Sequence, residues 1–212
     1  MQTITLDTID NLLIFSDLHC FHRNVLDFCK RPFENEKQMN AGLINNFNSK
    51  SNPDTIAFSL GDMFWFDSSR ECKKILHSMI FKTLYYIPGN HCSEKLLQNI
   101  HDWDERIIVC DSIVHLNFLD SKVYYVLSHY PLLTWPNRAS WHIDDDKRKS
   151  YNLFGHIHSR LDWDGKDRDC PYSFDQIDVG VDSHNLFPYT FEEVNEHLKL
   201  QERFKIFITP CE

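Results

Sequence analysis

The 212-residue sequence predicts an α/β fold in which β-sheets are layered with helices. Short apolar runs rich in β-branched and aromatic residues, each ended by polar or turn residues, recur along the chain and indicate buried strands. Helical patterns separate the runs of the first half, and such alternation is typical of α/β domains. The second half is richer in strands. Because no repeat or linker interrupts the chain, we expect one domain covering residues 1–212.

In the first half, strands are predicted at 12–15, 55–60 and 84–87, and helices at 22–30, 34–50, 68–81 and 93–102. In the helix predicted at 34–50, four apolar residues recur at the spacing of one helix face: Met39, Leu43, Ile44 and Phe47. In the second half, strands are predicted at 107–109, 113–119, 123–128, 151–154, 174–181 and 203–208. A helix is predicted at 191–200, because Thr190 and Glu193 form a capping box at its start.

Composition and charge narrow the class of protein. The apolar fraction of 42% and the charged fraction of 25% are those of a globular protein. The net charge of −9 argues against broad coating of duplex DNA. It does not exclude a phosphate substrate, because bound metal ions can reverse the local field.

Three sequence features bear on the compartment. No uninterrupted apolar stretch approaches the roughly 18 residues that span a membrane. The N-terminus lacks the basic start and apolar block of a signal peptide. The seven cysteines are scattered and form no C-x-x-C pair, so we expect reduced thiols. These features together predict a cytoplasmic protein that does not bind a membrane.

Polar residues typical of metal sites follow the predicted strands. Three of the six glycines directly precede such a residue, in Gly61-Asp62, Gly89-Asn90 and Gly155-His156. Glycine permits a tight turn at a strand end, and ligands of layered α/β folds bind at the carboxyl ends of strands. The complete set comprises Asp17-Leu18-His19, Gly61-Asp62, Gly89-Asn90-His91, Ser128-His129-Tyr130 and Gly155-His156-Ile157-His158.

The donor types of this set predict the metal. Within Asp17/His19 and within His156/His158 the partners are two residues apart, so on extended backbone each pair would point one way and serve one metal centre. Nitrogen and oxygen donors without thiolate suit Mn²⁺, Fe²⁺, Zn²⁺, Ni²⁺ or Co²⁺ better than Ca²⁺ or Mg²⁺. The donors are too many for one ion and fit two ions that share a carboxylate.

The five motifs resemble the calcineurin-like metallophosphoesterase superfamily, whose pattern is D-x-H, G-D, G-N-H-[D/E], H and G-H-x-H in this order. Other segments are similar to a subfamily of small bacterial and phage phosphoesterases: Ser16–His22, Phe28–Phe33, Met39-Asn40, Ser128–Leu132, Asn152–His156 and Val179–Asp182. The resemblance covers nearly the entire chain. It implies a four-layer sandwich of two mixed β-sheets flanked by α-helices.

The resemblance also implies a site. It assigns Asp17, His19 and His158 to one metal ion, and Asn90, His129 and His156 to a second ion, with Asp62 bridging both and His91 facing the substrate phosphate as the catalytic residue. It implies two divalent transition-metal ions, for which we expect Mn²⁺, with Fe²⁺, Zn²⁺, Ni²⁺ or Co²⁺ as further candidates. The implied reaction is phosphoester hydrolysis by a metal-bridging hydroxide, in a phosphodiesterase or phosphatase.

Residues beside the motifs are candidates for contacting the substrate. His22 and Arg23 begin the predicted helix after the first motif and could bind the phosphate. The run 63–66 could form a wall for a flat substrate group or pack in the core. The polar insertions 134–149 and 160–173 could be loops at the site or solvated connectors; they contain Trp135, Trp141 and Trp163.

One position departs from the family pattern. Cys92 follows Gly89-Asn90-His91, where the family usually has Asp or Glu. A thiol is a weak donor and a poor acceptor, so His91 lacks the partner that normally orients it. Asp67 and Asp182 are candidate replacements. A nucleophilic role for Cys92 lacks an activating neighbour in the sequence.

Two other functions stay open from the sequence. A nuclease or cyclic-nucleotide phosphodiesterase would act on a particular nucleotide; the basic run 147–149 could contact nucleic acid, but the acidic run 144–146 offsets its charge. A protein-binding scaffold that has lost catalysis would lack ligands, whereas all seven are present. The expected partner is therefore a small phosphoester or a nucleotide, with nucleic acid less favoured. The oligomeric state and the identity of the substrate stay open.

Overall fold

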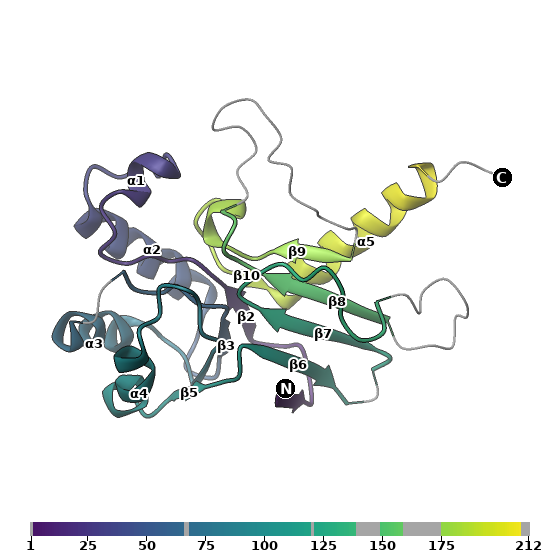
Figure 1. The fold of residues 1–212 in the computed structure, drawn as a ribbon, viewed down its shortest axis with the longest axis horizontal. Helices are drawn as coiled ribbons and strands as arrows, with labels where there is room; N and C mark the ends of the chain where they lie inside the picture. Colours follow the sequence, from purple (N-terminus) through teal and green to yellow (C-terminus); the bar gives the residue numbers. More distant parts are fainter. Residues whose placement is uncertain (1, 66–67, 120, 139–148, 159–174, 209–212) are drawn as a thin grey trace.

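The computed structural model describes residues 2–65, 68–119, 121–138, 149–158 and 175–208, and for 201–208 the backbone alone. Two five-stranded mixed sheets pack against each other, with helices on one side and at one edge (Figure 1). The prediction of an α/β fold with two mixed sheets is confirmed. Within this part of the chain, no helix is both long enough and apolar enough to cross a membrane.

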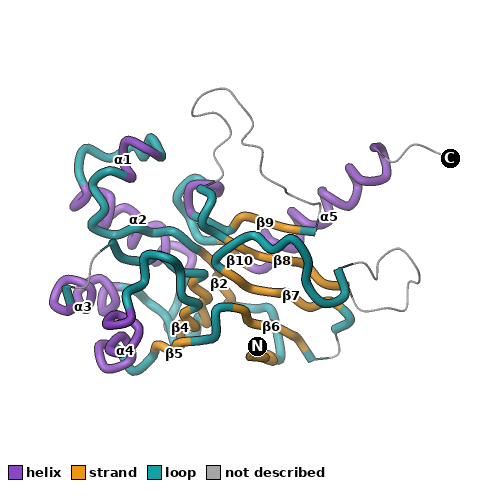
Figure 2. Tube along the Cα trace, viewed as in Figure 1, coloured by secondary structure: helices purple, strands orange, loops and turns teal. Residues whose placement is uncertain are grey.

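The first sheet has the order β10-β2-β3-β4-β5, and only β10 runs antiparallel to its neighbour. Its strands are β10 (Tyr189–Thr190), β2 (Leu12–Phe15), β3 (Ile56–Ser59), β4 (Thr83–Tyr86) and β5 (Ile107–Val109). The helices beside it are α1 (Val25–Phe28), α2 (Glu36–Lys50), α3 (Ser69–Ser78) and α4 (Glu94–Trp103) (Figure 2). Alternate residues of β2 face opposite cores: Leu13 and Phe15 pack towards the helices, and Leu12 and Ile14 towards the second sheet.

The second sheet has the order β1-β6-β7-β8-β9, in which only β6 and β7 pair antiparallel. Its strands are β1 (Gln2–Leu6), β6 (Ile113–Phe118), β7 (Val123–Ser128), β8 (Lys149–Phe154) and β9 (Gln176–Asp178). Its inner face shares one apolar core with the first sheet. The helix α5 (Phe191–Ile208) joins this core through Phe191, whose ring contacts those of Phe118 and Tyr125.

Part of the outer face of the second sheet is covered by a loop residue: within the described residues, Tyr124 and Val126 pack against Trp135. Trp135 is buried and its indole donates a 3.0 Å hydrogen bond to Ser150. Trp135 is therefore a core residue, although it lies in the loop that follows β7. The other tryptophans of the insertions, the basic run at 147–148 and the acidic run at 144–146 lie outside the described residues.

Most predicted elements are confirmed within one or two residues at each end, including 12–15, 107–109 and 123–128 without change. The strand predicted at 203–208 is wrong, because α5 continues through it to Ile208. No Gly or Pro interrupts the chain between 191 and 208. The predicted helix 22–30 is short, covering Val25–Phe28. The structure adds β1 and β10, and a short 3₁₀ turn at Val181–Ser183.

The predicted buried face of α2 and the predicted capping box of α5 are both confirmed. In α2, Met39, Leu43, Ile44 and Phe47 are buried, as predicted. The capping box also forms: the backbone N–H of Thr190 donates to Glu193 at 2.8 Å, and that of Glu193 donates to the Thr190 hydroxyl at 3.2 Å.

Candidate metal centre

The predicted ligands converge where the two sheets meet. Asp17 follows β2, Asp62 follows β3 and Asn90 follows β4, all in the first sheet, whereas His129 and His156 follow β7 and β8 of the second sheet. Because β2, β3 and β4 are parallel, and β7 and β8 are parallel, these loops leave their sheets at shared edges. An isolated bridge between Ser16 and Gly180 joins the sheets directly beside Asp17.

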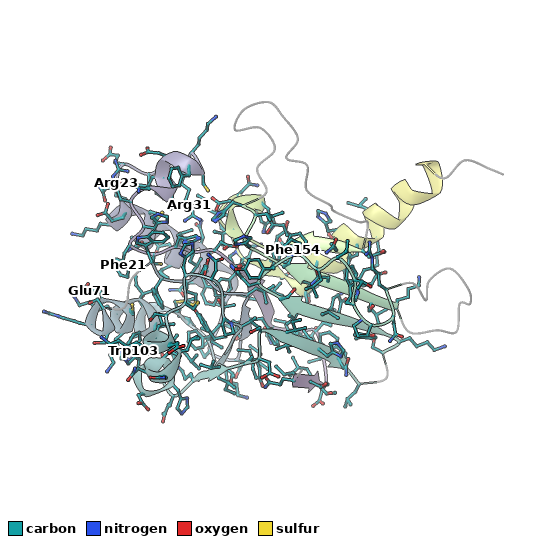
Figure 3. The ribbon with its side chains drawn as sticks, in the orientation of Figure 1. Phe21, Arg23, Arg31, Glu71, Trp103 and Phe154 are labelled. Atoms are coloured by element: carbon teal, nitrogen blue, oxygen red, sulfur yellow. The ribbon has the colours of Figure 1, made fainter. Side chains whose placement is uncertain are left out.

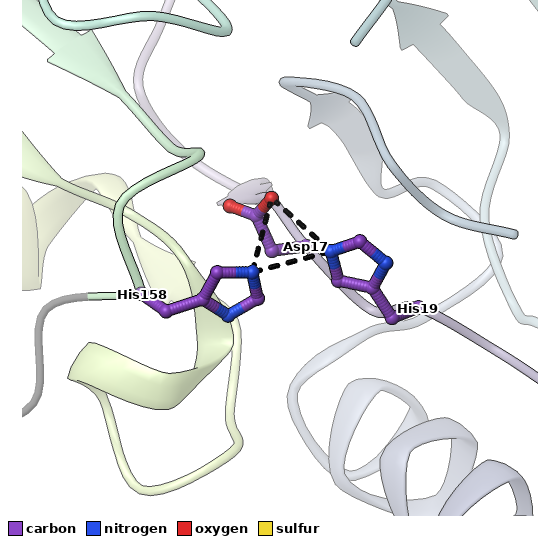
Figure 4. Close-up of side chains that lie close together, drawn as sticks. All are labelled: Asp17, His19 and His158. Carbon is purple, nitrogen blue, oxygen red and sulfur yellow. Dashed lines mark hydrogen bonds and ion pairs between the residues drawn. The ribbon is translucent and has the colours of Figure 1, made fainter. Parts of the chain in front are cut away.

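The first part of the site, called the Asp17 half below, consists of Asp17, His19 and His158 (Figure 4). The Nε2 atoms of His19 and His158 lie 3.2 Å apart. They lie 3.8 and 4.0 Å from Oδ1 of Asp17. Three donor atoms therefore face one point, as the resemblance implied for one metal ion.

The second part, called the Asn90 half, consists of Asn90, His129 and His156. Nε2 of His129 lies 2.9 Å from Oδ1 of Asn90. The His156 ring lies edge-on to the His129 ring, with centroids 5.2 Å apart, but its nitrogens are in none of the close donor groups among the described residues. Its backbone N–H instead donates to Oδ2 of Asp17 at 2.8 Å. His156 is thus beside the predicted site, with its ring outside the tight cluster.

Asp62 lies between the two halves. Its Oδ2 is 3.3 Å from Nε2 of His129 and 3.9 Å from Nε2 of His19. Its Oδ1 accepts a 2.9 Å hydrogen bond from the backbone N–H of His91. A carboxylate in this position can act as a ligand to both of two neighbouring ions.

Hydrogen bonds fix which nitrogen of two histidines faces the centre. Nδ1 of His129 donates to the carbonyl of Leu60 at 2.7 Å, and Nδ1 of His158 donates to Asp182 at 2.6 Å. Both rings therefore turn Nε2 towards the carboxylates. Such partners on the second nitrogen are the usual support of a metal-binding imidazole.

The backbone at the ligands is left-handed. Positive φ values occur at five of the seven predicted ligands: Asp17 (60°), His19 (49°), Asp62 (52°), His156 (71°) and His158 (46°). This conformation is uncommon for residues with a side chain and often marks functional sites. The prediction that the pairs lie on extended backbone is therefore wrong, and His156 and His158 turn to different halves.

The glycines before the ligands are required mainly for space. A Cβ at Gly155 would lie 2.1 Å from the Ser16 hydroxyl and 2.4 Å from the Asp17 carboxylate. A Cβ at Gly89 would lie 2.2 Å from the Asp62 carboxylate. Of the three, only Gly61 also has a positive φ, of 101°. The expected turn geometry thus applies to Gly61, and close approach of neighbouring loops applies to the other two.

A buried arginine supports the Asp17 half. The guanidinium of Arg31 donates to both carboxylate oxygens of Asp182, at 2.9 and 2.8 Å, and to the carbonyls of Asp17 and Leu18, each at 2.7 Å. Asp182 in turn holds His158. The side chains of Arg31 and Asp182 are both 0% exposed (Arg31 is labelled in Figure 3). This network links the first motif to the 3₁₀ turn, and sequence reasoning missed it.

The pKa shifts follow from burial and from these contacts. Burial raises the pKa of Asp17 to about 6. Burial and the charge of His158 lower the pKa of His19 to about 2. Burial also acts to lower the pKa of His158, but hydrogen bonds to Asp182 and Cys29, together with Asp17, raise it to about 11. The site therefore concentrates buried titratable groups whose protonation depends on one another.

The residues present fit divalent transition metals. Oδ1 of Asp17 and Nδ1 of His19 are buried and have no hydrogen-bond partner. A buried carboxylate oxygen without a partner is costly, and a cation removes that cost. The donors are carboxylate, amide and imidazole, which suit Mn²⁺, Fe²⁺ or Zn²⁺. Among the described residues two thiols lie near these donors: Sγ of Cys29 is 3.4 Å from Nδ1 of His158, and Sγ of Cys92 is 3.8 Å from Oδ1 of Asp62.

His91 and His22 border the site, and Arg23 does not join it. The His91 ring is 5.5 Å from that of His19, and the His22 ring is 5.3 Å from it, between centroids. His22 is buried, whereas His91 is exposed. Arg23 is exposed near α1, and no contact joins its side chain to the candidate ligands among the described residues (Figure 3).

Of the two candidate replacements for the missing acid, only Asp182 lies within the described residues, and it does not contact His91. Asp182 pairs with His158 and Arg31 instead of His91, and Asp67 lies outside the described residues. The Sγ of Cys92 accepts from the backbone N–H of Gly89 at 3.2 Å and lies 3.0 Å from the Tyr86 hydroxyl. Burial raises the pKa of the Cys92 thiol, which argues against a thiolate nucleophile. All five described cysteines, Cys20, Cys29, Cys72, Cys92 and Cys110, are free thiols.

Comparisons with known proteins define the fold but not the activity. No family model matches the chain. An uncharacterized protein of Methanocaldococcus jannaschii is 31% identical over 80 residues, which is 38% of this chain and 46% of that protein, so the match spans about half of that relative. The crystal structure of a protein of unknown function from Aquifex aeolicus shares the fold, with a TM-score of 0.64 and 19% identity, covering 87% of this chain and 97% of that one. The two-sheet α/β architecture is therefore shared with a solved structure.

Proposed function

We propose that this protein is a phosphoester hydrolase that depends on two divalent metal ions, with the sandwich fold and site of the calcineurin-like metallophosphoesterases. The observation that carries the proposal is the convergence of donors from loops of both sheets on one cluster, which Asn90 joins through His129 and which contains a buried, unpartnered carboxylate oxygen. The candidate ligands are spread along the sequence from Asp17 to His158, so only the fold brings them together.

The proposed ligands divide between the two halves. Asp17, His19 and His158 would hold one ion, and Asn90 and His129 the other, with His156 completing the second set and Asp62 shared. Bound there, the ions would bind phosphoryl oxygens and lower the pKa of a water molecule into the neutral range. Two divalent ions bring +4 and the two aspartates bring −2, so the site would be positive by about two charges in a protein of net charge −9. Phosphate binding is thus compatible with the overall charge.

The chain's own residues orient the reaction. The backbone N–H of His91 holds one oxygen of Asp62, which keeps the shared carboxylate in place and the His91 ring at the open side of the site. In hydrolysis the oxygen of water forms a bond to phosphorus, and the bond between phosphorus and the ester oxygen breaks. The attacking water releases one proton to solvent, and the departing oxygen takes up one proton, which in this proposal the exposed His91 ring donates. Asn90 and His22 complete the polar border.

The substitution Asp62→Asn tests this proposal. We expect it to abolish hydrolysis of aryl phosphodiesters in the presence of Mn²⁺, a loss of about a thousandfold or more, because the site loses the charge shared by both ions. Metal content, measured by elemental analysis, should fall in the same variant. A panel of aryl monoesters, aryl diesters and cyclic nucleotides separates a phosphatase from a phosphodiesterase.

The matched control is Asp54→Asn, at the opposite end of the same strand. Asp54 is exposed in the turn before β3, whereas Asp62 follows that strand. The control should keep both metal content and turnover. Full turnover in Asp62→Asn, or a wild-type protein that binds metal but hydrolyses no phosphoester, would show the proposal to be wrong.

A further inference from the structure

The exposed aromatic side chains of the described residues gather at the candidate site. Large apolar side chains are exposed at eight positions, and only three of these are aromatic: Phe28, Trp65 and Tyr130. Tyr130 contacts the rings of His156 and His129, at 4.5 and 5.1 Å between centroids. Trp65 and Phe28 lie at the other half, around His22. An aromatic border on a polar site indicates a ligand that contains a flat group.

Trp65 is held in a defined orientation. Its ring stacks on the buried His22, with centroids 3.5 Å apart and an interplanar angle of 6°. It also lies 4.6 Å from the His91 ring and 6.1 Å from that of His19. Phe28, which is 55% exposed, contacts His22 edge-on. Even with these contacts, 42% of Trp65 stays exposed.

The exposure of Trp65 is not explained by core packing. The two residues before it in the predicted aromatic run, Met63 and Phe64, are 0% and 1% exposed and belong to the core. The chain thus turns Trp65 outward, next to the imidazole that is proposed to donate the proton. A ring fixed beside the reacting group can bind a planar substituent at a small cost in side-chain entropy.

We propose that the ligand of this site is a nucleoside phosphoester whose base stacks on Trp65. This inference rests on the proposed function, since it assigns the phosphate to the metal centre. Base stacking on an aromatic side chain is sequence-tolerant and contributes substantially to affinity. The net charge of −9 favours a single nucleotide over a nucleic-acid strand, which would bring many phosphates.

Equilibrium binding tests the inference without requiring turnover. The Mn²⁺-loaded protein is titrated in a calorimeter with 5′-deoxythymidine 5′-phosphonate, in which phosphorus is bonded directly to C5′, and with methylphosphonate. Neither compound has an ester oxygen to cleave. We expect the thymidine ligand to bind about tenfold more tightly or better. In Trp65→Ala the ratio of the two affinities should fall to about one. In Trp65→Phe, which keeps a flat ring, the ratio should lie between that of Trp65→Ala and that of the wild type.

Ile80→Ala is the matched control, because Ile80 is also 42% exposed but follows α3, outside the candidate site. This variant should keep the wild-type ratio. A wild-type ratio near one, or an unchanged ratio in Trp65→Ala with normal metal content, would overturn the inference. A tenfold ratio that depends on Trp65, in a protein that hydrolyses no phosphoester, would support the ligand class while refuting the proposed reaction.

Discussion

The two halves of the candidate metal centre are held in different ways. In the Asp17 half, the side chains of Asp17, His19 and His158 are 0%, 4% and 18% exposed, and a buried arginine–aspartate pair lies behind them. In the Asn90 half, Asn90 is exposed and His156 is half-buried, and only His129 is buried. One half is fixed by charges inside the protein, and the other borders solvent.

This difference indicates a division of tasks. Arg31 binds two backbone carbonyls of the first motif and the carboxylate that orients His158, so protein contacts support the geometry of the Asp17 half. The Asn90 half has fewer such supports and is more exposed to solvent at Asn90. Pre-organised donors of this kind are typical of tightly held metal ions. We therefore expect the two ions to bind with different affinities, the tighter one in the Asp17 half.

The largest effect is expected from Arg31→Met, which removes the support of the Asp17 half. The substitution leaves the buried carboxylate of Asp182 without its guanidinium and two carbonyls without a donor, so the free energy of unfolding should fall by about 3–5 kcal/mol. The measurement is urea denaturation in the presence of a chelator. Arg23→Met, at an exposed arginine, should change the same quantity by less than about 0.5 kcal/mol. Equal losses in both variants would remove the distinction between a buried support and an ordinary surface arginine.

Asp182→Asn should lower the affinity for only one of the two ions. The amide keeps the shape of the side chain but loses the charge that holds Nδ1 of His158, and losing such a partner typically costs about 10–100-fold in metal affinity. Competition between the protein and a Mn²⁺ indicator should resolve one weakened and one unchanged site. Asp104→Asn, at a buried aspartate paired with Arg106 away from the centre, is the control and should leave both sites unchanged. If both ions weakened equally, the two halves would not be independent.

The smallest effect is expected from His156→Ala, which tests the open half. Alanine keeps the backbone N–H that binds Asp17, so only the ring is lost. Because this ring is outside the close donor groups of the described residues, we expect a loss of about tenfold in the affinity of the weaker ion. The stronger ion should be unaffected, and His184→Ala provides a remote half-buried histidine as control. Unchanged affinity for both ions would exclude His156 as a ligand.

The sequence predicted what local patterns encode. Strand ends followed by Asp62, Asn90, His129 and His156 could be identified because apolar runs and glycines mark them. The capping box at Thr190 marked the start of α5 for the same reason. The end of that helix was missed, since strand-like residues near 203–208 also continue a helix when no breaker intervenes.

The parts that the sequence did not predict depend on contacts between distant segments. Arg31 and Asp182 are 151 residues apart, and nothing local in either segment indicates that they are buried together. The left-handed backbone at Asp17 and His19 is also a tertiary effect, because these residues do not favour it on their own. The segments that contain Arg31 and Asp182 were both matched to the small phosphoesterases in sequence, but the match did not indicate that the two side chains contact each other.

The origin of the ligands in both sheets has a consequence for the stability of the whole molecule. Asp17, His19, Asp62 and Asn90 lie in loops that follow strands of one sheet, and His129, His156 and His158 lie in loops that follow strands of the other. In the proposed holoprotein, each ion would therefore be a cross-link between layers that otherwise adhere mainly through apolar contact. Its contribution would grow with the logarithm of the free ion concentration above the dissociation constant. The free concentration of the metal ion would then determine the stability of the folded protein as well as its activity.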